Sequence, residues 1–97
     1  MRPAAAPTPA PIRLGGRTIY LDVYAEVAGI DFELDGAAYH GDPVQRERDL
    51  RRDAALFAQH RITTVRYSHR RLTTEPETVR REVRAMLRGA RPVDKRP

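Results

Sequence analysis

The sequence predicts an α/β domain with the element order β-β-β-α-β-α and a mixed four-stranded sheet. Two observations carry this prediction. Apolar and polar residues alternate with β periodicity before residue 36, and a helix start signal with a helical apolar stripe follows residue 42. The chain has 97 residues and no cysteine, so it has room for one small domain and none for a disulfide framework or a thiolate metal site.

A β-hairpin is expected at the start of the domain. Gly15 and Gly16 can supply the positive φ of a tight turn between residues 12–14 and 17–24. In the second arm Leu21 and Val23 point to one face, and Asp22 points to the opposite, polar face.

The third expected strand, Ile30–Asp35, carries three carboxylates on one face: Asp31, Glu33 and Asp35. Acids two positions apart on a strand lie about 6–7 Å from each other and repel. Such a face is tolerated where it is solvated, where arginines neutralise it, or where a divalent cation binds. If the two strands pair, Asp22 and Glu33 can converge, and two carboxylates with water suffice for Mg²⁺. Asp31, at the entry of the strand, is expected to be a solvated acid.

Two helices and a fourth strand complete the domain. The first helix begins with Asp42 as N-cap and Pro43 as first residue, and its expected buried stripe is Leu50, Ala54, Phe57 and Ala58. Residues 62–67 are rich in β-branched side chains and predict a strand. The last helix is expected to start with a capping box of Thr74 and Glu77 and to end at Gly89 in the left-handed conformation. Its expected buried stripe is Val79, Val83, Met86 and Leu87.

Both ends of the chain predict disordered tails. Residues 1–11 are a Pro/Ala segment and residues 90–97 a short basic one, which leaves 12–89 as the folded domain. No apolar run approaches the ~18 residues of a spanning helix, and the first residues lack a secretory pattern. We therefore expect a cytoplasmic protein with no membrane partner.

Charge is unevenly distributed along the chain. Residues 1–42 hold three basic and six acidic side chains (net −3), whereas residues 43–97 hold fifteen basic and seven acidic ones (net +8). A compact acidic cluster facing a basic half fits a protein that acts on a polyanion, with carboxylates for a cation and arginines for phosphates. The alternative is a compositional preference for arginine, which accounts for seventeen of the eighteen basic residues.

The chain also resembles the very-short-patch-repair-like endonuclease domain of the PD-(D/E)XK nuclease superfamily over roughly residues 17–88. The resemblance rests on an ordered set of motifs: Leu21-Asp22, Glu33-Leu34-Asp35-Gly36, His40, Arg46-x-x-Asp49-x-x-Arg52, Val65-Arg66-Tyr67 and the segment from Leu72 to Pro76. It implies a restriction-endonuclease-like core. The usual leading helix is missing here, and its place is taken by the Pro/Ala tail. This departure suggests a truncated product, a minimal variant, or a protomer completed by a second copy.

The resemblance implies that Asp22 and Glu33 are the two acids that hold Mg²⁺ or Mn²⁺. The third position of the motif, usually lysine, is Asp35 here, and the only lysine, Lys95, lies in the tail. His40, five residues further on, is the best candidate to replace that lysine, because imidazole accepts a proton near neutral pH. His60 and His69 are expected at the surface without a role.

The first helix and the fourth strand add the remaining candidate residues. Gln45, Asp49 and Arg52 fall at i, i+4 and i+7 off the apolar stripe, so they either support the acidic strand or form an ordinary exposed face. In the first case Arg52 touches a phosphate or pins a carboxylate. Arg46, Arg52 and Arg66 are the candidates for nucleic-acid contacts.

Three function classes follow. The leading interpretation is a metal-dependent DNA endonuclease. The second is a catalytically inactive or truncated nuclease fold that binds nucleic acid through its basic half. The third is an interaction module in which an exposed sheet face pairs with a partner or a second copy.

Overall fold

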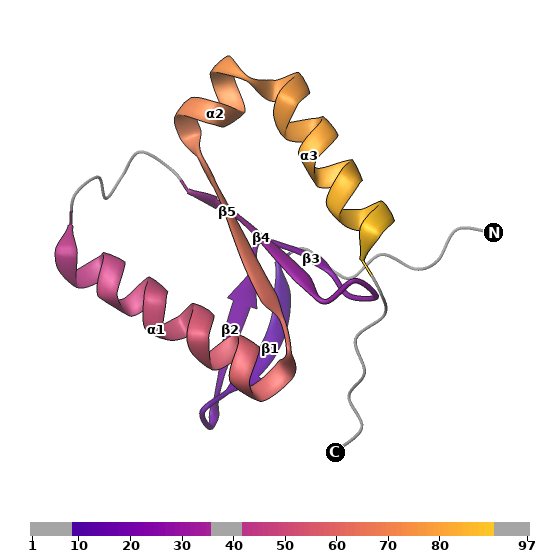
Figure 1. Ribbon diagram of the computed structural model, residues 1–97. Helices are drawn as coiled ribbons and strands as arrows, with labels where there is room; N and C mark the ends of the chain where they lie inside the picture. Colours follow the sequence, from indigo (N-terminus) through magenta and orange to yellow (C-terminus); the bar gives the residue numbers. More distant parts are fainter. Residues whose placement is uncertain (1–8, 36–41, 91–97) are drawn as a thin grey trace.

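The structure is a computed structural model that describes residues 9–35 and 42–90 (Figure 1). Within these ranges it is an α/β arrangement, as predicted. Its strands are β1 (Ala10–Leu14), β2 (Arg17–Leu21), β3 (Val23–Ala25), β4 (Ile30–Asp35) and β5 (Thr63–Ser68), and its helices are α1 (Pro43–His60), α2 (His69–Thr74) and α3 (Pro76–Gly89).

The strands form two sheets instead of the single four-stranded sheet that was predicted. β1 and β2 pair as an antiparallel hairpin, with Gly15 and Gly16 at positive φ in the turn as expected. β3, β4 and β5 form a second sheet in that order, antiparallel between β3 and β4 and parallel between β4 and β5. The three-stranded sheet is therefore mixed, as the sequence predicted.

The second sheet exists because the expected long strand 17–24 breaks at Asp22. The backbone N–H of Asp22 donates to the Glu33 side chain at 3.1 Å and not to a neighbouring strand. The ladder is interrupted at this residue, so β2 continues the hairpin while β3 pairs with β4. The break places Asp22 at the junction of the two sheets.

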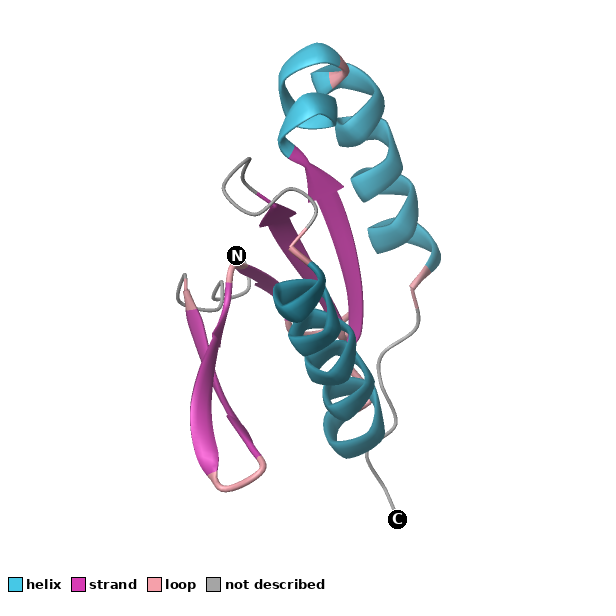
Figure 2. Ribbon diagram, turned by 90° about the vertical axis from the view of Figure 1, so that its left-hand side faces the viewer, coloured by secondary structure: helices cyan, strands magenta, loops and turns pink. Residues whose placement is uncertain are grey.

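Helices cover both faces of the three-stranded sheet (Figures 1 and 2). α1 and the hairpin enclose one apolar cluster, which includes Leu21, Leu56 and Ile62. α3 covers the opposite face and encloses a second cluster, in which Phe32 packs with Val79. β4 lies between the two layers, which cover both of its faces as far as Glu33, whereas Leu34 is 47% exposed.

α1 begins as predicted but turns a different face to the protein. The Asp42 carboxylate accepts hydrogen bonds from the N–H groups of Val44 and Gln45, and Pro43 is the first helical residue. The predicted buried stripe is wrong: Leu50 is 54% exposed and Phe57 is 48% exposed. Ala54 and Ala58 are exposed as well, whereas Leu56 is fully buried. The polar side of α1 faces the sheet because β4 and β5 present charged partners there.

α2 is a short helix that the sequence did not predict, and it changes the start of α3. The Ser68 hydroxyl caps α2, and Thr74 closes it by donating to the Arg70 carbonyl at 2.7 Å. The predicted capping box is therefore wrong, and α3 starts at Pro76 without a side-chain cap. The end of α3 also differs, since Gly89 is still helical and Ala90 is extended.

An ion pair attaches the two C-terminal helices to the sheet. Arg71 of α2 binds Glu82 of α3 at 2.8 Å, and the Tyr67 hydroxyl of β5 donates to the same carboxylate at 3.2 Å. Hydrogen bonding from Arg71 lowers the pKa of Glu82.

At the other end of the domain, β1 begins at Ala10, two residues before the predicted start, because Ala10 is buried against the hairpin core.

Candidate metal and nucleic-acid site

The acidic strand β4 has two covered faces of opposite character. Ile30 and Phe32 point into the α3 layer, as the alternation predicted. Asp31 and Glu33 point to the α1 side, where they are 0% and 6% exposed. The side chain of Asp35, the third predicted acid of this face, lies outside the described residues. The predicted acidic face thus lies beneath a helix and not in solvent.

Asp22 and Glu33 are brought together, as the sequence predicted. Glu33 Oε2 accepts the Asp22 N–H at 3.1 Å, and Asp22 Oδ2 accepts the Leu34 N–H at 3.0 Å. The Glu33 carboxylate therefore binds the backbone of Asp22, and the Asp22 carboxylate binds the backbone next to Glu33. These reciprocal hydrogen bonds hold the two acids at the junction of the two sheets.

Asp31 differs from its expected role as a solvated acid. It is fully buried, and neither carboxylate oxygen has a hydrogen-bond partner among the described residues. Burial, together with the neighbouring Glu33 carboxyl, raises the pKa of Asp31 from its ordinary 3.8 to about 8, against the opposing effect of Arg52.

Arg52 of α1 lies beside the acids and pins them, one of the two roles considered for it. Its Nη2 donates to the Tyr20 carbonyl at 2.7 Å, and its Nη1 lies 3.8 Å from Glu33 Oε1. Its Nε is buried without a partner among the described residues. The guanidinium thus links β2 to β4 and supplies one positive charge to the acidic cluster.

The remaining polar residues of α1 bind Arg66 of β5. Arg66 makes a two-pronged pair with Asp53, at 3.0 and 2.8 Å, and lies 3.8 Å from Asp49. Gln45 donates to Asp49 at 3.1 Å, so Gln45 and Asp49 support this layer and do not form an ordinary exposed face. Arg66 is therefore engaged inside the domain, and its contact with nucleic acid stays a prediction. The side chain of Arg46 is exposed, so its predicted role remains open.

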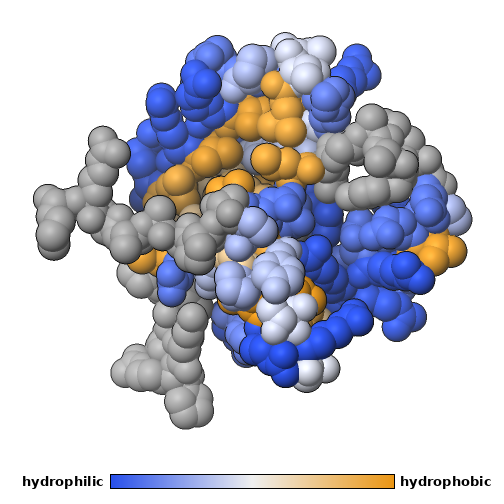
Figure 3. Space-filling view, turned by 180° about the vertical axis from the view of Figure 1, so that it is seen from behind, coloured by the Kyte–Doolittle hydropathy of each residue, from blue (hydrophilic) through white to orange (hydrophobic). Residues whose placement is uncertain are grey.

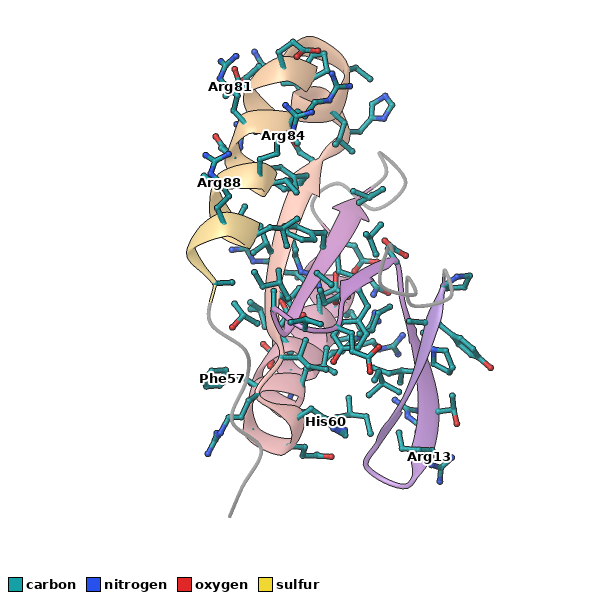
Figure 4. All side chains as sticks on the ribbon, turned by 90° about the vertical axis from the view of Figure 1, so that its right-hand side faces the viewer. Arg13, Phe57, His60, Arg81, Arg84 and Arg88 are labelled. Carbon is teal, nitrogen blue, oxygen red and sulfur yellow. The ribbon has the colours of Figure 1, made fainter. Side chains whose placement is uncertain are left out.

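His60 has a structural role that the sequence did not predict. Its Nε2 donates to the Arg13 carbonyl of β1 at 2.6 Å, and the side chain points toward the hairpin while Phe57 points to the other side (Figure 4). The neighbouring Gln59 side chain accepts the Gly15 N–H at 3.4 Å. The last turn of α1 thus fixes the hairpin, and no local sequence pattern predicts this long-range contact.

His40 and Gly36 lie outside the described residues.

Among the described residues, no three acidic, histidine or cysteine side chains form a ready metal-binding group. The donors present still suit a hard cation. Mg²⁺ takes one or two carboxylates and completes its shell with water, and Asp22 and Glu33 offer carboxylate oxygens at the junction of the two sheets. The pairing of these two acids is the observation that supports this fit.

The opposite side of the domain is apolar and basic. Leu72, Pro76, Val79 and Val83 line a groove of about 490 Å³ between α2 and α3, edged by Arg80 and Arg84. Figure 3 shows apolar residues gathered on this side between hydrophilic ones. The groove lining includes no acid, so it offers nothing for cation chemistry.

Arginines follow one another along α3. Arg81, Arg84 and Arg88 lie on this helix (Figure 4). Arg84 and Arg88 make no hydrogen bond or ion pair with the residues that the structure describes. Their charges are therefore available to an anionic partner.

Comparison of the chain with protein-family models, curated proteins and solved structures finds no match. Within the described residues, none of the helices is long and apolar enough to cross a membrane.

Proposed function

We propose that this chain is a metal-dependent phosphodiesterase that cleaves DNA in the cytoplasm, with a restriction-endonuclease-like core. One observation carries the proposal: Asp22, between β2 and β3, and Glu33 of β4 meet at the junction of the two sheets beside a third, buried acid. The resemblance of the ordered motifs to the very-short-patch-repair-like endonuclease domain supports the same activity.

Asp22 and Glu33 would hold Mg²⁺ or Mn²⁺. A bound divalent cation supplies positive charge to a phosphoryl oxygen and lowers the pKa of a coordinated water. Arg52, already anchored to the Tyr20 carbonyl, places its guanidinium beside these acids, where it can bind a phosphate oxygen. Asp35 and His40 are the proposed proton acceptors for the attacking water, and exposed Arg46 is a proposed contact to the DNA backbone.

Plasmid nicking with separate acid variants tests this function. With Mg²⁺ or Mn²⁺ present, the wild-type chain should nick DNA, and Asp22→Asn or Glu33→Gln should each lower the rate about 100-fold or more. Glu47→Gln is the matched control, because Glu47 is an exposed acid of α1 that pairs with the equally exposed Arg51. Nicking that persists in both site variants contradicts the proposal.

A second candidate is a nucleic-acid-binding protein without catalysis, which the arginines of α3 favour. Arg84→Gln combined with Arg88→Gln should weaken DNA binding, and the slope of log K against log salt should fall by about 0.9 for each phosphate that the variant no longer neutralises. Binding to DNA without cleavage in either metal would select this candidate. A dimer in light scattering would support the interpretation that a second copy completes the domain.

A further inference from the structure

The groove between α2 and α3 joins an apolar surface to a row of arginines. Its apolar lining comes from both helices: Leu72, Pro76, Val79 and Val83. Leu34, on the same face of β4 as Phe32, is 47% exposed, so the apolar layer that α3 covers also reaches the surface at the end of this strand. Apolar side chains gathered in a groove are typical of a binding surface, whereas single exposed ones are common on any protein.

Arginines of α3 border this groove and continue past it at regular spacing. Arg80, Arg84 and Arg88 repeat every four residues, so successive ones lie about 6 Å apart along the helix axis. All three side chains are exposed. Arg80 pairs with the exposed Glu77 at 2.8 Å, whereas Arg84 and Arg88 pair with no residue in the described ranges 9–35 and 42–90. A partner whose carboxylates follow the same four-residue spacing could therefore bind this row.

The charge of the segment that forms the groove stays positive after its internal ion pairs are counted. Residues 69–90 hold six arginines and three glutamates, a net charge of +3. Each glutamate already pairs with an arginine of the same segment: Glu75 and Glu82 with Arg71, and Glu77 with Arg80. The surface therefore favours an acidic partner.

The apolar lining and the arginine row together select the kind of partner. Nucleic-acid phosphates could bind the arginines, but they carry no apolar side chains that would fill the groove. A symmetric contact with a second copy would bring the arginine row against itself, which like-charge repulsion opposes. An amphipathic helix with acids beside its apolar face supplies both complements, as helices that lie in apolar grooves do.

We propose that the α2–α3 groove binds an acidic amphipathic helix of another protein. Apolar side chains of that helix would occupy the groove over Val79 and Val83, and its carboxylates would pair with Arg84 and Arg88. The groove is separate from the acids at the junction of the two sheets, so this interaction does not depend on the proposed phosphodiesterase activity.

Fluorescence anisotropy of the full chain with a labelled synthetic peptide tests this proposal. The probe is a helical peptide of about 16 residues with leucines on one face and glutamates at four-residue spacing on the adjoining face. It should bind with a dissociation constant on the order of 10–100 μM, and a control peptide with glutamine in place of every glutamate should bind at least about tenfold more weakly. Failure of the acidic peptide to bind, or equal binding of the two peptides, would overturn the proposal.

Three variants locate the binding on the groove. Arg84→Glu should weaken binding of the acidic peptide at least about tenfold, because it turns an attraction into a repulsion. Val83→Thr keeps the shape of the lining and adds a hydroxyl, so it should weaken binding at least about threefold. Arg48→Glu makes the same change in net charge on an exposed residue of α1, and it should leave the affinity within about twofold of wild type. Leu72→Ala changes the same lining and takes the place of Val83→Thr if that variant does not fold.

The pattern across these variants decides between acidic helix and nucleic acid. Weakening by both Arg84→Glu and Val83→Thr, with Arg48→Glu unchanged, supports the proposed partner. Equal weakening by Arg84→Glu and Arg48→Glu would show attraction by net charge alone and refute the groove. A double-stranded DNA oligonucleotide that displaces the peptide, together with full peptide binding by Val83→Thr, would assign the arginines to phosphates and likewise refute it.

Discussion

Replacing Asp31 by asparagine should remove a large part of the pH dependence of this domain's stability. Asp31 is fully buried and its pKa is raised from 3.8 to about 8, mainly by burial. Between these two values the folded state retains a proton that the unfolded state has lost. The contribution of this group to the free energy of unfolding is therefore highest below pH 4, falls as the pH rises toward 8, and levels off above it.

The pKa difference sets the size of the effect. One pH unit corresponds to about 1.4 kcal/mol, so the stability of wild type relative to Asp31→Asn should fall by about 3 kcal/mol between pH 5.5 and 8. A domain of this size has a total stability of only about 5–10 kcal/mol, so the wild type should be visibly weakened at alkaline pH. Asparagine has its own unsatisfied amide, which shifts the absolute stability without changing this slope.

Urea unfolding followed by far-UV circular dichroism, with EDTA present, measures this difference at each pH. The chain contains no tryptophan, so the helix signal is the suitable probe. Subtracting the variant curve from the wild-type curve cancels the titration of distant groups such as Glu82. Two curves that stay parallel from pH 5.5 to 8 would refute the assignment of Asp31 as a buried, proton-holding acid.

Three other variants probe the packing of α1. Arg66→Gln leaves the half-buried Asp53 without its two-pronged partner and should cost about 1.5–3 kcal/mol in urea unfolding; a loss below about 0.5 kcal/mol would contradict this pairing. Leu56→Ala removes a fully buried side chain and should lower the free energy of unfolding by about 2–5 kcal/mol. Phe57→Ala should lower it by under about 1 kcal/mol in the same assay, because Phe57 is 48% exposed. The reverse order would show that α1 turns its other face to the protein. His60→Ala removes the hydrogen bond to the Arg13 carbonyl, so amide hydrogen exchange in β1 should become roughly tenfold faster relative to exchange in α3, as measured by NMR. Exchange in β1 that stays as slow as in wild type would exclude this anchor.

Features decided by neighbouring residues were predicted well. The Gly15-Gly16 turn and the Asp42-Pro43 helix start depend on two adjacent residues each, and both are confirmed. The start of α3 was predicted wrongly, because Ser68 caps an additional helix that incorporates Thr74. A local helix-start signal can therefore fail when a helix that begins a few residues earlier includes the same residues.

The buried face of α1 shows what sequence periodicity misses. The apolar stripe through Leu50 and Phe57 predicted the inner face on the assumption that the protein beneath the helix is apolar. Here the surface beneath α1 carries Glu33 and Arg66, so the helix turns its charged side inward to pair with them. Predicting this requires knowing which strands lie under the helix, and that is a long-range property of the fold.

The candidate site was predicted in part for the same reason. Strand alternation placed Glu33 and Asp31 on one face, and the expected strand pairing, supported by the resemblance, joined Glu33 with Asp22. The structure brings Asp22 and Glu33 together. The alternation could not show that this face is covered, so Asp31 was expected in solvent. Burial of a strand face depends on the helix that packs on it, which the strand's own sequence does not encode.

The buried acid beneath α1 makes the stability of the domain depend on pH. Once Asp31 ionises, a carboxylate buried in the domain lowers its stability, and an apolar residue in its place would cost less. A variant that removes the Asp31 carboxyl should therefore gain stability over wild type mainly at alkaline pH. An equal gain at pH 5.5 and pH 8 would show that ionisation of this acid does not set the effect.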